Sequence, residues 1–148
     1  MKVFWVDEEE RAAYSEIVQM KFHDVDVDYE LDADIALERL SENNFSFSEY
    51  RAFIIDAHMP TFGDIRFRDS DGAIDKSLAG VRLCQHLSSN FPANWDSMRT
   101  RTVIYTTLVH KQLIEQVRDF CCDNELEFMH RTDDGSVYQR IVELGWLN

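Results

Sequence analysis

Short apolar runs and segments of helical periodicity alternate along the chain. Nearly unbroken apolar runs, which are typical of strands buried on both faces, occur at residues 3–6, 50–55, 102–107 and 126–129. Residues 25–29 alternate apolar and polar side chains, and this pattern predicts an edge or half-exposed strand. Apolar residues recur at helical spacing at about 8–20, 35–44, 80–87, 111–122 and 134–144. Asp32 is a candidate cap for the second helix, whose buried face is expected to contain Ile35, Ala36, Leu37 and Leu40.

This order of elements predicts an α/β fold. Alternating strands and helices form parallel sheets with right-handed crossovers, so we expect a flavodoxin-like, doubly wound, five-stranded parallel sheet with helices on both faces. The length predicts a single domain, residues 1–148, with an extended loop at about 61–79. Within that loop, Asp69-Ser70-Asp71-Gly72 is a turn signal that could tip a small hairpin. Residues 88–101, which contain Pro92, are predicted to form a second loop.

Composition narrows the classes of partner. The chain carries 15 basic and 28 acidic residues, which leaves a formal charge of -13. This balance argues against nonspecific nucleic-acid binding and against docking on anionic membranes, because both need clustered Lys and Arg. No apolar run is long enough for a signal peptide or a membrane helix, so the cytoplasm is the expected compartment. Cys84, Cys121 and Cys122 form no disulfide framework and are expected to pack between helices.

Polar residues follow several predicted strands at the point where each strand ends. Asp7 and Glu8 follow the first strand, Asp56 follows the third, and Thr107 and Arg131 end the last two. Parallel sheets bind ligands at the carboxyl ends of their strands. Acids gathered there would repel one another unless a cation lay between them, and Mg²⁺ prefers carboxylate oxygens. A hydroxyl and a fixed positive charge could hold phosphoryl oxygens, and Asp56 could be the nucleophile that accepts a phosphoryl group.

These motifs, in this order, resemble the response-regulator receiver domain of two-component signalling, in particular the chemotaxis-regulator type. The resemblance covers essentially the whole chain. It rests on the acidic segment Val6-Asp7-Glu8-Glu9, the phosphoacceptor strand and turn Ile54-Ile55-Asp56-Ala57-His58-Met59-Pro60, the helix start Gly80-Val81-Arg82-Leu83, the strand Val103-Ile104-Tyr105-Thr106-Thr107 and the strand Phe128-Met129-His130-Arg131.

The resemblance implies a role for each matching residue. Asp56 would be the phosphoacceptor, and Glu8, Asp56 and the backbone carbonyl of His58 would ligate Mg²⁺, with Asp7 acting nearby or through water. Thr107 would bond the phosphoryl group and shift on activation, and Phe128 would swing between outward and inward rotamers. The remaining roles are Arg131 as the basic residue of the site and His58 and Leu108 as modulators of dephosphorylation and donor access. The implied partners are a sensor histidine kinase or phosphotransfer protein and a downstream effector protein, with a homodimer as a further option.

The sequence departs from the family pattern at five places. The family has Lys where this chain has Arg131, and a proline where it has Thr132. Arginine keeps the charge but replaces a compact ammonium with a wide planar fork. Leu108 stands where the family usually has a small residue, and Glu8 is one methylene longer than the usual Asp. The loop after Pro60 is also longer than that of the family; it could be a partner-binding lid, an extra hairpin or a tolerated insertion.

Three functions compete on these observations. The first is a working phospho-switch, in which a kinase phosphorylates Asp56; the domain would then be a phosphoacceptor that only phosphorylates and dephosphorylates itself, not an enzyme acting on other substrates. The second is a receiver-like interaction module with weakened or lost phosphotransfer, which Arg131, Thr132 and Leu108 motivate. The third is a phosphohydrolase built on the acid pair of Asp26-Val27-Asp28, which lies on a predicted edge strand. A transition-metal site at His110 and His130 is a weaker alternative.

Overall fold

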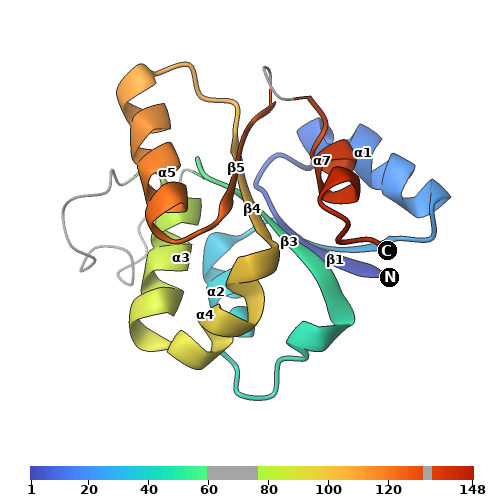
Figure 1. Ribbon diagram of the computed structural model, residues 1–148, viewed down its shortest axis with the longest axis horizontal. Coiled ribbons are helices and arrows are strands. Elements are labelled where there is room, and N and C mark those ends of the chain that lie inside the picture. The colour runs from blue at the N-terminus through green and yellow to red at the C-terminus, as the bar shows by residue number, and fades with distance from the viewer. Residues whose placement is uncertain (60–76, 132–134) are drawn as a thin grey trace.

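Five parallel strands form a single sheet in the computed structural model, which describes residues 1–59, 77–131 and 135–148. Its spatial order is β2-β1-β3-β4-β5, with all neighbouring strands parallel (Figure 1). The strands are β1 (Lys2–Val6), β2 (Asp26–Glu30), β3 (Tyr50–Asp56), β4 (Thr102–Thr106) and β5 (Glu127–His130). The predicted flavodoxin-like, doubly wound fold is therefore confirmed, and β2 lies at an edge as its alternating pattern indicated.

Helices cover both faces of this sheet. The described helices are α1 (Glu10–Phe22), α2 (Ala33–Leu40), α3 (Ala79–Asn90), α4 (Pro92–Met98), α5 (Lys111–Asp123) and α7 (Val137–Glu143), with short 3₁₀ turns η1 (Phe47–Glu49) and η3 (Arg99–Arg101). Helices α1 and α7 pack on one face, and α2 to α5 pack on the other (Figure 1). None of the helices in the described parts of the chain combines the length and apolar character that crossing a membrane requires.

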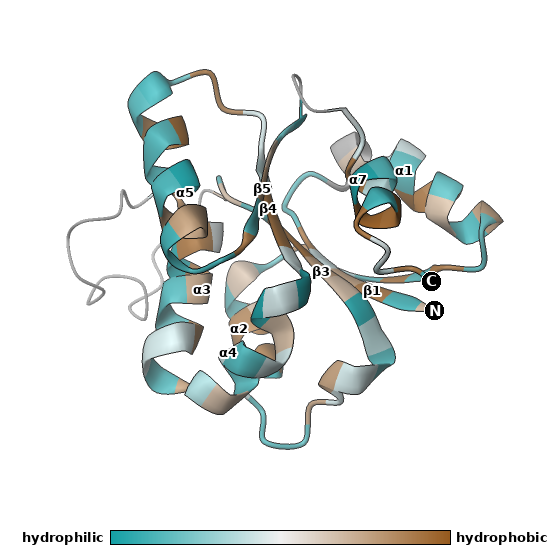
Figure 2. Ribbon diagram, in the orientation of Figure 1, coloured by the Kyte–Doolittle hydropathy of each residue, from teal (hydrophilic) through white to brown (hydrophobic). Residues whose placement is uncertain are grey.

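Successive strand residues feed two separate cores because side chains alternate between the two faces of a strand. In β1, Phe4 and Val6 join the core under α2 to α5, whereas Val3 and Trp5 join the core under α1 and α7. The same alternation repeats in β3 and β4. Figure 2 shows the strands as mostly apolar and the outward faces of the helices as mostly hydrophilic. This two-sided burial explains why the strands read as nearly continuous apolar runs.

The structure confirms some expectations about the helices and corrects others. Asp32 does cap α2, accepting hydrogen bonds from the backbone N–H groups of Asp34 and Ile35. However, Ile35 is 47% exposed, because the buried face of α2 consists of Ala33, Ala36, Leu37 and Leu40. Cys84 and Cys121 are buried as expected, whereas Cys122 is exposed.

The predicted loop at 88–101 was wrong. Helix α3 continues to Asn90, and α4 begins directly at Pro92. Proline suits the first turn of a helix, where its fixed φ is helical and the missing N–H would have no partner. Trp95 and Met98, three residues apart, anchor this short helix in the core. The hairpin proposed at Asp69-Ser70-Asp71-Gly72 lies outside the described residues, as does most of the 61–79 loop.

Candidate functional site at the carboxyl ends of the strands

The fold brings the predicted site residues to one edge of the sheet. Asp56 is the last residue of β3, Asp7 follows β1 directly, and Thr107 follows β4. Arg131 follows β5, so its backbone lies at the same edge. Because β1, β3, β4 and β5 are adjacent and parallel, these four positions are neighbours in space although they are far apart in the sequence.

Asp7 is held rigidly by donors on both of its carboxylate oxygens. Its Oδ1 accepts a hydrogen bond from the backbone N–H of Glu9 at 2.8 Å, and its Oδ2 accepts one from the hydroxyl of Tyr105. The indole Nε1 of Trp5 donates in turn to the Tyr105 oxygen at 3.1 Å. Burial raises the pKa of Asp7, while the Tyr105 hydroxyl and the charge of Arg131 oppose that rise. A chain of hydrogen bonds thus connects the core to the acidic site.

Asp56 carries the most perturbed carboxylate of this edge. Its Oδ1 accepts a hydrogen bond from the backbone N–H of His58 at 3.1 Å. Burial, and then the negative charge of Asp7, raise the pKa of Asp56 to about 8. The pKa of Glu8 is also raised, first by burial and then by the charges of Asp32 and Asp7. Burial and mutual repulsion therefore disfavour the charged forms of these described carboxylates, and a cation between them would relieve the repulsion.

Backbone packing fixes the position of Asp56. The N–H of Ala57 donates to the carbonyl of Tyr105 at 2.9 Å, and the N–H of Gly80 donates to the carbonyl of Ala57 at 3.2 Å. A Cβ atom at Gly80 would lie 1.9 Å from the backbone oxygen of Asp56, a distance that no side chain tolerates. The start of α3 therefore rests directly on the last residue of β3, and glycine is required there.

The hydroxyls at the end of β4 have different environments. Thr106 is buried, and its Oγ1 accepts a hydrogen bond from the N–H of Leu108 at 3.0 Å. Thr107 is exposed, so its hydroxyl can turn toward a ligand at this edge. The carbonyl of Leu108 lies 2.7 Å from Nε2 of His130. His130 thus binds the β4–α5 connection, and His110 is exposed.

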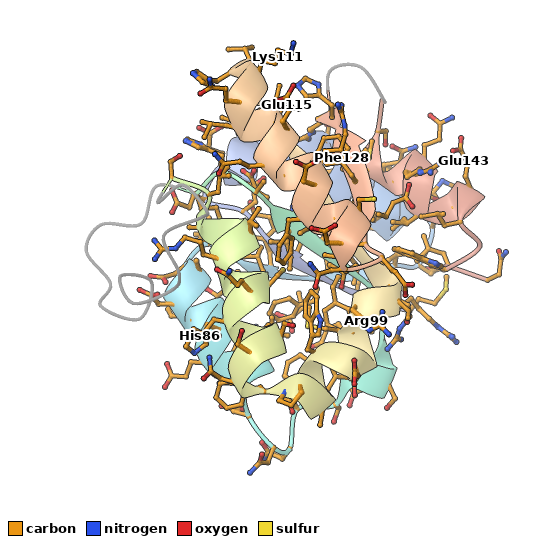
Figure 3. The ribbon with its side chains drawn as sticks, turned by 60° about the vertical axis from the view of Figure 1, so that its left-hand side comes forward. His86, Arg99, Lys111, Glu115, Phe128 and Glu143 are labelled. Carbon is orange, nitrogen blue, oxygen red and sulfur yellow. The ribbon has the colours of Figure 1, made fainter. Side chains whose placement is uncertain are left out.

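Phe128 lies partly buried between β5 and α5. It packs against the core under α2 to α5, and the Arg118 guanidinium carbon lies 5.1 Å from its ring centroid. Figure 3 shows Phe128 beside α5, below the end of that helix that carries Lys111 and Glu115. This half-buried position fits a ring that could move either inward or outward.

Arg131 makes an ion pair that sequence analysis did not foresee. Its Nη2 lies 2.8 Å from Oε2 of Glu16, which projects from α1, and both side chains are largely buried. The guanidinium also lies over the ring of Tyr105, 5.4 Å from its centroid. A signal for Glu16 was present in the sequence, since it lies on the same helical stripe as Ala13, Ile17 and Met20 and is an acid where an apolar residue is expected.

The carboxylates at this edge can be compared with the ligands that Mg²⁺, the ion implied by the fold, requires. Within residues 1–59, 77–131 and 135–148, no three His, Cys, Asp or Glu side chains are grouped closely enough to hold a metal ion by themselves. Mg²⁺, however, is usually bound by one or two carboxylates and several waters. Two neighbouring carboxylates with raised pKa values, Asp7 and Asp56, therefore fit this ion.

The acid pair of the phosphohydrolase hypothesis is arranged differently. Asp26 is exposed, and both oxygens of Asp28 accept hydrogen bonds, from Arg39 at 3.0 and 2.7 Å and from Tyr50 at 2.7 Å. These donors lower the pKa of Asp28. A carboxylate neutralised by a bidentate arginine is a weak nucleophile, so this pair is not a good candidate for an aspartyl nucleophile.

Comparison with solved structures identifies the fold. A Francisella response-regulator receiver domain superimposes with a TM-score of 0.61 at 17% identity, over 99% of this chain and 94% of that one. The receiver domain of Klebsiella pneumoniae RstA, in a BeF3-activated state, gives 0.62 at 15% identity over 100% of both chains. The chain has the fold of a response-regulator receiver domain. No family model and no curated protein matches the sequence.

A third neighbour bears on the chemistry. A response regulator from Burkholderia pseudomallei, solved with a phosphorylated aspartic acid, a calcium ion and citrate, gives a TM-score of 0.58 at 10% identity, over 95% of this chain and 64% of that one. At these identities the similarity establishes the receiver fold alone. The chemistry of this chain must therefore be argued from its own residues.

Proposed function

We propose that this chain is a response-regulator receiver in which Mg²⁺-dependent phosphoryl transfer from a sensor kinase to Asp56 switches partner binding. The observation that carries the proposal is the state of Asp56. It is a half-buried carboxylate at the carboxyl end of a central parallel strand, and burial, together with the adjacent charge of Asp7, raises its pKa to about 8. A phosphorylated aspartic acid is present in the Burkholderia neighbour, which has the same fold, and this supports an aspartate as the phosphoacceptor.

The transfer requires a nucleophile and compensation for charge. A carboxylate oxygen of Asp56 attacks phosphorus, and the bond between phosphorus and the donor atom breaks. That atom is the imidazole nitrogen of a phosphohistidine or the oxygen of acetyl phosphate, and the donor departs with the electron pair. Glu8, Asp56 and the backbone carbonyl of His58 would ligate Mg²⁺, with Asp7 acting nearby or through water. The ion would neutralise charge on the phosphoryl oxygens. The exposed hydroxyl of Thr107 would donate to a phosphoryl oxygen, and Arg131 would supply positive charge at the site.

The test is phosphorylation by a small donor. The protein is incubated with acetyl phosphate or phosphoramidate and Mg²⁺, and its intact mass is measured. We expect a single phosphoryl adduct in the wild type and none in Asp56→Asn. Asp119→Asn, which removes an exposed acid of α5, is the matched control and keeps the adduct. Absence of an adduct in the wild type, under conditions that modify a control receiver, would contradict the proposal.

A receiver-like interaction module is the second candidate function. The ion pair between Arg131 and Glu16 favours it, because it engages the basic residue of the site with an internal carboxylate. Under this alternative, Asp56→Ala would leave binding of the partner protein unchanged. Under our proposal, the partners are a sensor histidine kinase or phosphotransfer protein and an effector, with a second copy of the chain as a further candidate. This activity would operate in the cytoplasm.

A further inference from the structure

The side chain of Glu16 connects two elements that the proposed mechanism treats separately. It lies in the middle of α1 and is only 6% exposed. Its Oε2 pairs with Nη2 of Arg131 at 2.8 Å. Its Oε1 accepts hydrogen bonds from the hydroxyl of Ser136 at 2.8 Å and from the backbone N–H of Tyr138 at 3.1 Å. One carboxylate thus binds the basic residue of the site with one oxygen and the first turn of α7 with the other.

The α7 branch of this network is a helix cap. Ser136 is the N-cap of α7, and its hydroxyl also accepts a hydrogen bond from the N–H of Gln139 at 3.3 Å. Glu16 provides a negative charge beside the same helix terminus, where exposed N–H groups favour it. A carboxylate of α1 therefore helps to fix the start of α7, and Figure 1 shows these two helices side by side on one face of the sheet.

The Arg131 branch is an electrostatic constraint on the site. The guanidinium lies over Tyr105, whose hydroxyl binds Asp7, and its charge opposes the rise that burial causes in the pKa of Asp7. The Arg131 guanidinium is therefore close enough to influence the charges of the proposed phosphorylation site while it is paired with Glu16. A phosphoryl group on Asp56 would have to compete with a buried carboxylate for this guanidinium, and buried charge-assisted pairs are the strong ones.

We propose that Glu16 is a positioning residue for Arg131: it holds the guanidinium on the α1 side of the site and couples its release to the start of α7. The inference rests on the proposed function. It implies that phosphoryl capture and the Glu16–Arg131 pair oppose each other, and that capture of Arg131 weakens the contact between α1 and the first turn of α7. By linkage, whatever strengthens the Glu16–Arg131 pair must also weaken phosphoryl capture by the same factor.

Glu16→Gln separates the two branches. The amide oxygen of glutamine can still accept from Ser136 and Tyr138, whereas its NH₂ group cannot accept from Arg131. We expect the acetyl phosphate reaction at Asp56 to become faster by roughly tenfold, the factor that corresponds to about 1.4 kcal/mol. Glu127→Gln is the matched control. It weakens the ion pair between Glu127 of β5 and Arg140 of α7, which lies outside the site. The control should react at the wild-type rate.

The double variant Glu16→Gln/Arg131→Gln tests whether the gain passes through Arg131. If it does, Glu16→Gln gives no acceleration in the Arg131→Gln background. A purely structural role of Glu16 would instead slow the reaction in both backgrounds. Should Glu16→Gln fail to fold, Glu16→Asp keeps the charge and withdraws it by one methylene, and a smaller acceleration is expected.

Ser136→Ala removes the other branch and leaves the Glu16–Arg131 pair intact. It should destabilise α7 and, by the same linkage, accelerate the reaction, but by less than Glu16→Gln does. The reciprocal measurement is amide hydrogen exchange in phosphorylated wild type, which should be faster at Tyr138 and Gln139 than in the unmodified protein. Unchanged exchange at these amides would contradict the coupling.

The outcomes distinguish this inference from the proposed function. A wild type that forms the adduct, with Glu16→Gln no faster, overturns the inference and leaves the function standing. A wild type that forms no adduct while Glu16→Gln does supports the inference and contradicts phosphotransfer as a property of the native chain. If neither protein forms an adduct, there is no phosphoryl group for Arg131 to serve, and both statements are wrong.

Discussion

Two aspartates of the same sheet, Asp28 and Asp56, have pKa values that are shifted in opposite directions. Asp28, on the edge strand β2, accepts two hydrogen bonds from Arg39 and one from Tyr50, and its pKa is lowered, chiefly by the Arg39 bond. Asp56, at the end of the central strand β3, accepts one backbone hydrogen bond and faces Asp7, and its pKa is raised to about 8. Burial acts against the charged form in both cases, so the neighbouring donors decide the sign.

The difference separates an acid that is paired with an arginine from the proposed phosphoacceptor. Around Asp28, the aromatic rings of Phe4, Phe45 and Tyr50 pack against one another, and the Arg39 guanidinium also lies 4.8 Å from the ring centroid of Phe4. Around Asp56, the backbone N–H of His58 donates to the carboxylate, and the described residues that raise or lower its pKa include no cationic side chain. Functional sites often retain such unfavourable charge at the expense of stability.

The largest expected effect is that of adding a side chain under Asp56. Gly80→Ala would place a Cβ atom against the Asp56 carbonyl, where backbone cannot move aside without breaking the pairing of β3 with β4. We expect a loss of about 3 kcal/mol in the free energy of unfolding, measured by urea denaturation. Gly135→Ala is the control, since Gly135 has open space around it but a φ of 85°, and it should cost about 1 kcal/mol. Equal losses would contradict the steric argument.

The sequence predicted the strands well because two-sided burial leaves an unmistakable apolar signature. Because a polar residue follows several of these apolar runs, the sequence also indicated a candidate site at the carboxyl ends of the strands. It missed α4, because Pro92 was interpreted as a loop signal although the first helical turn accommodates it. It also missed the roles of Tyr105 and Gly80, since each depends on contacts between residues distant in the sequence, which no local pattern encodes. For Glu16 the available signal, an acid on the apolar stripe of α1, indicated burial but not the partner.

Tyr105→Phe should have the next largest effect. It removes the donor to Asp7 and leaves the Trp5 indole N–H without its acceptor in the core. A buried polar group left without a partner costs about 1–3 kcal/mol, so we expect a loss of about 2 kcal/mol on urea unfolding. The fluorescence of Trp5, measured with Trp95 and Trp146 replaced by Phe, should also shift. Tyr138→Phe, a half-buried tyrosine of α7, is the comparison and should leave this fluorescence unchanged.

The two aspartates should respond to neutralisation with opposite signs. Asp28→Asn loses its ion pair with Arg39 and should cost about 1–2 kcal/mol. Asp56→Asn removes the cost of burying this carboxyl beside Asp7, which the folded wild type meets at pH 7 by binding a proton, and should stabilise the fold by about 1 kcal/mol in the presence of a metal chelator. Urea unfolding at pH 7 measures both. A destabilised Asp56→Asn would show that the Asp56 carboxylate is a structural group, like that of Asp28.

The smallest expected effects are on the pH dependence of stability, to which Asp28 and Asp56 should contribute with opposite signs. The folded pKa of Asp28 lies below its unfolded value, so its contribution is present above about pH 4 and is lost as the pH falls further. The folded pKa of Asp56 lies above its unfolded value, so stability is lost as the pH rises from about 4 toward 8. Thermal unfolding across this range, without metal, should show a weaker decline in Asp56→Asn. An identical decline in wild type and Asp56→Asn would contradict the charge repulsion at Asp56.

The most direct test of the account is the location of the phosphoryl group. Acetyl phosphate and Mg²⁺ are added to the wild type, the acyl phosphate is reduced with borohydride, and the modified residue is identified by peptide mapping. The account predicts modification at Asp56 and none at Asp28, although both are aspartates of the same sheet. Modification spread over several of the 28 acidic residues, or confined to any residue other than Asp56, would contradict it.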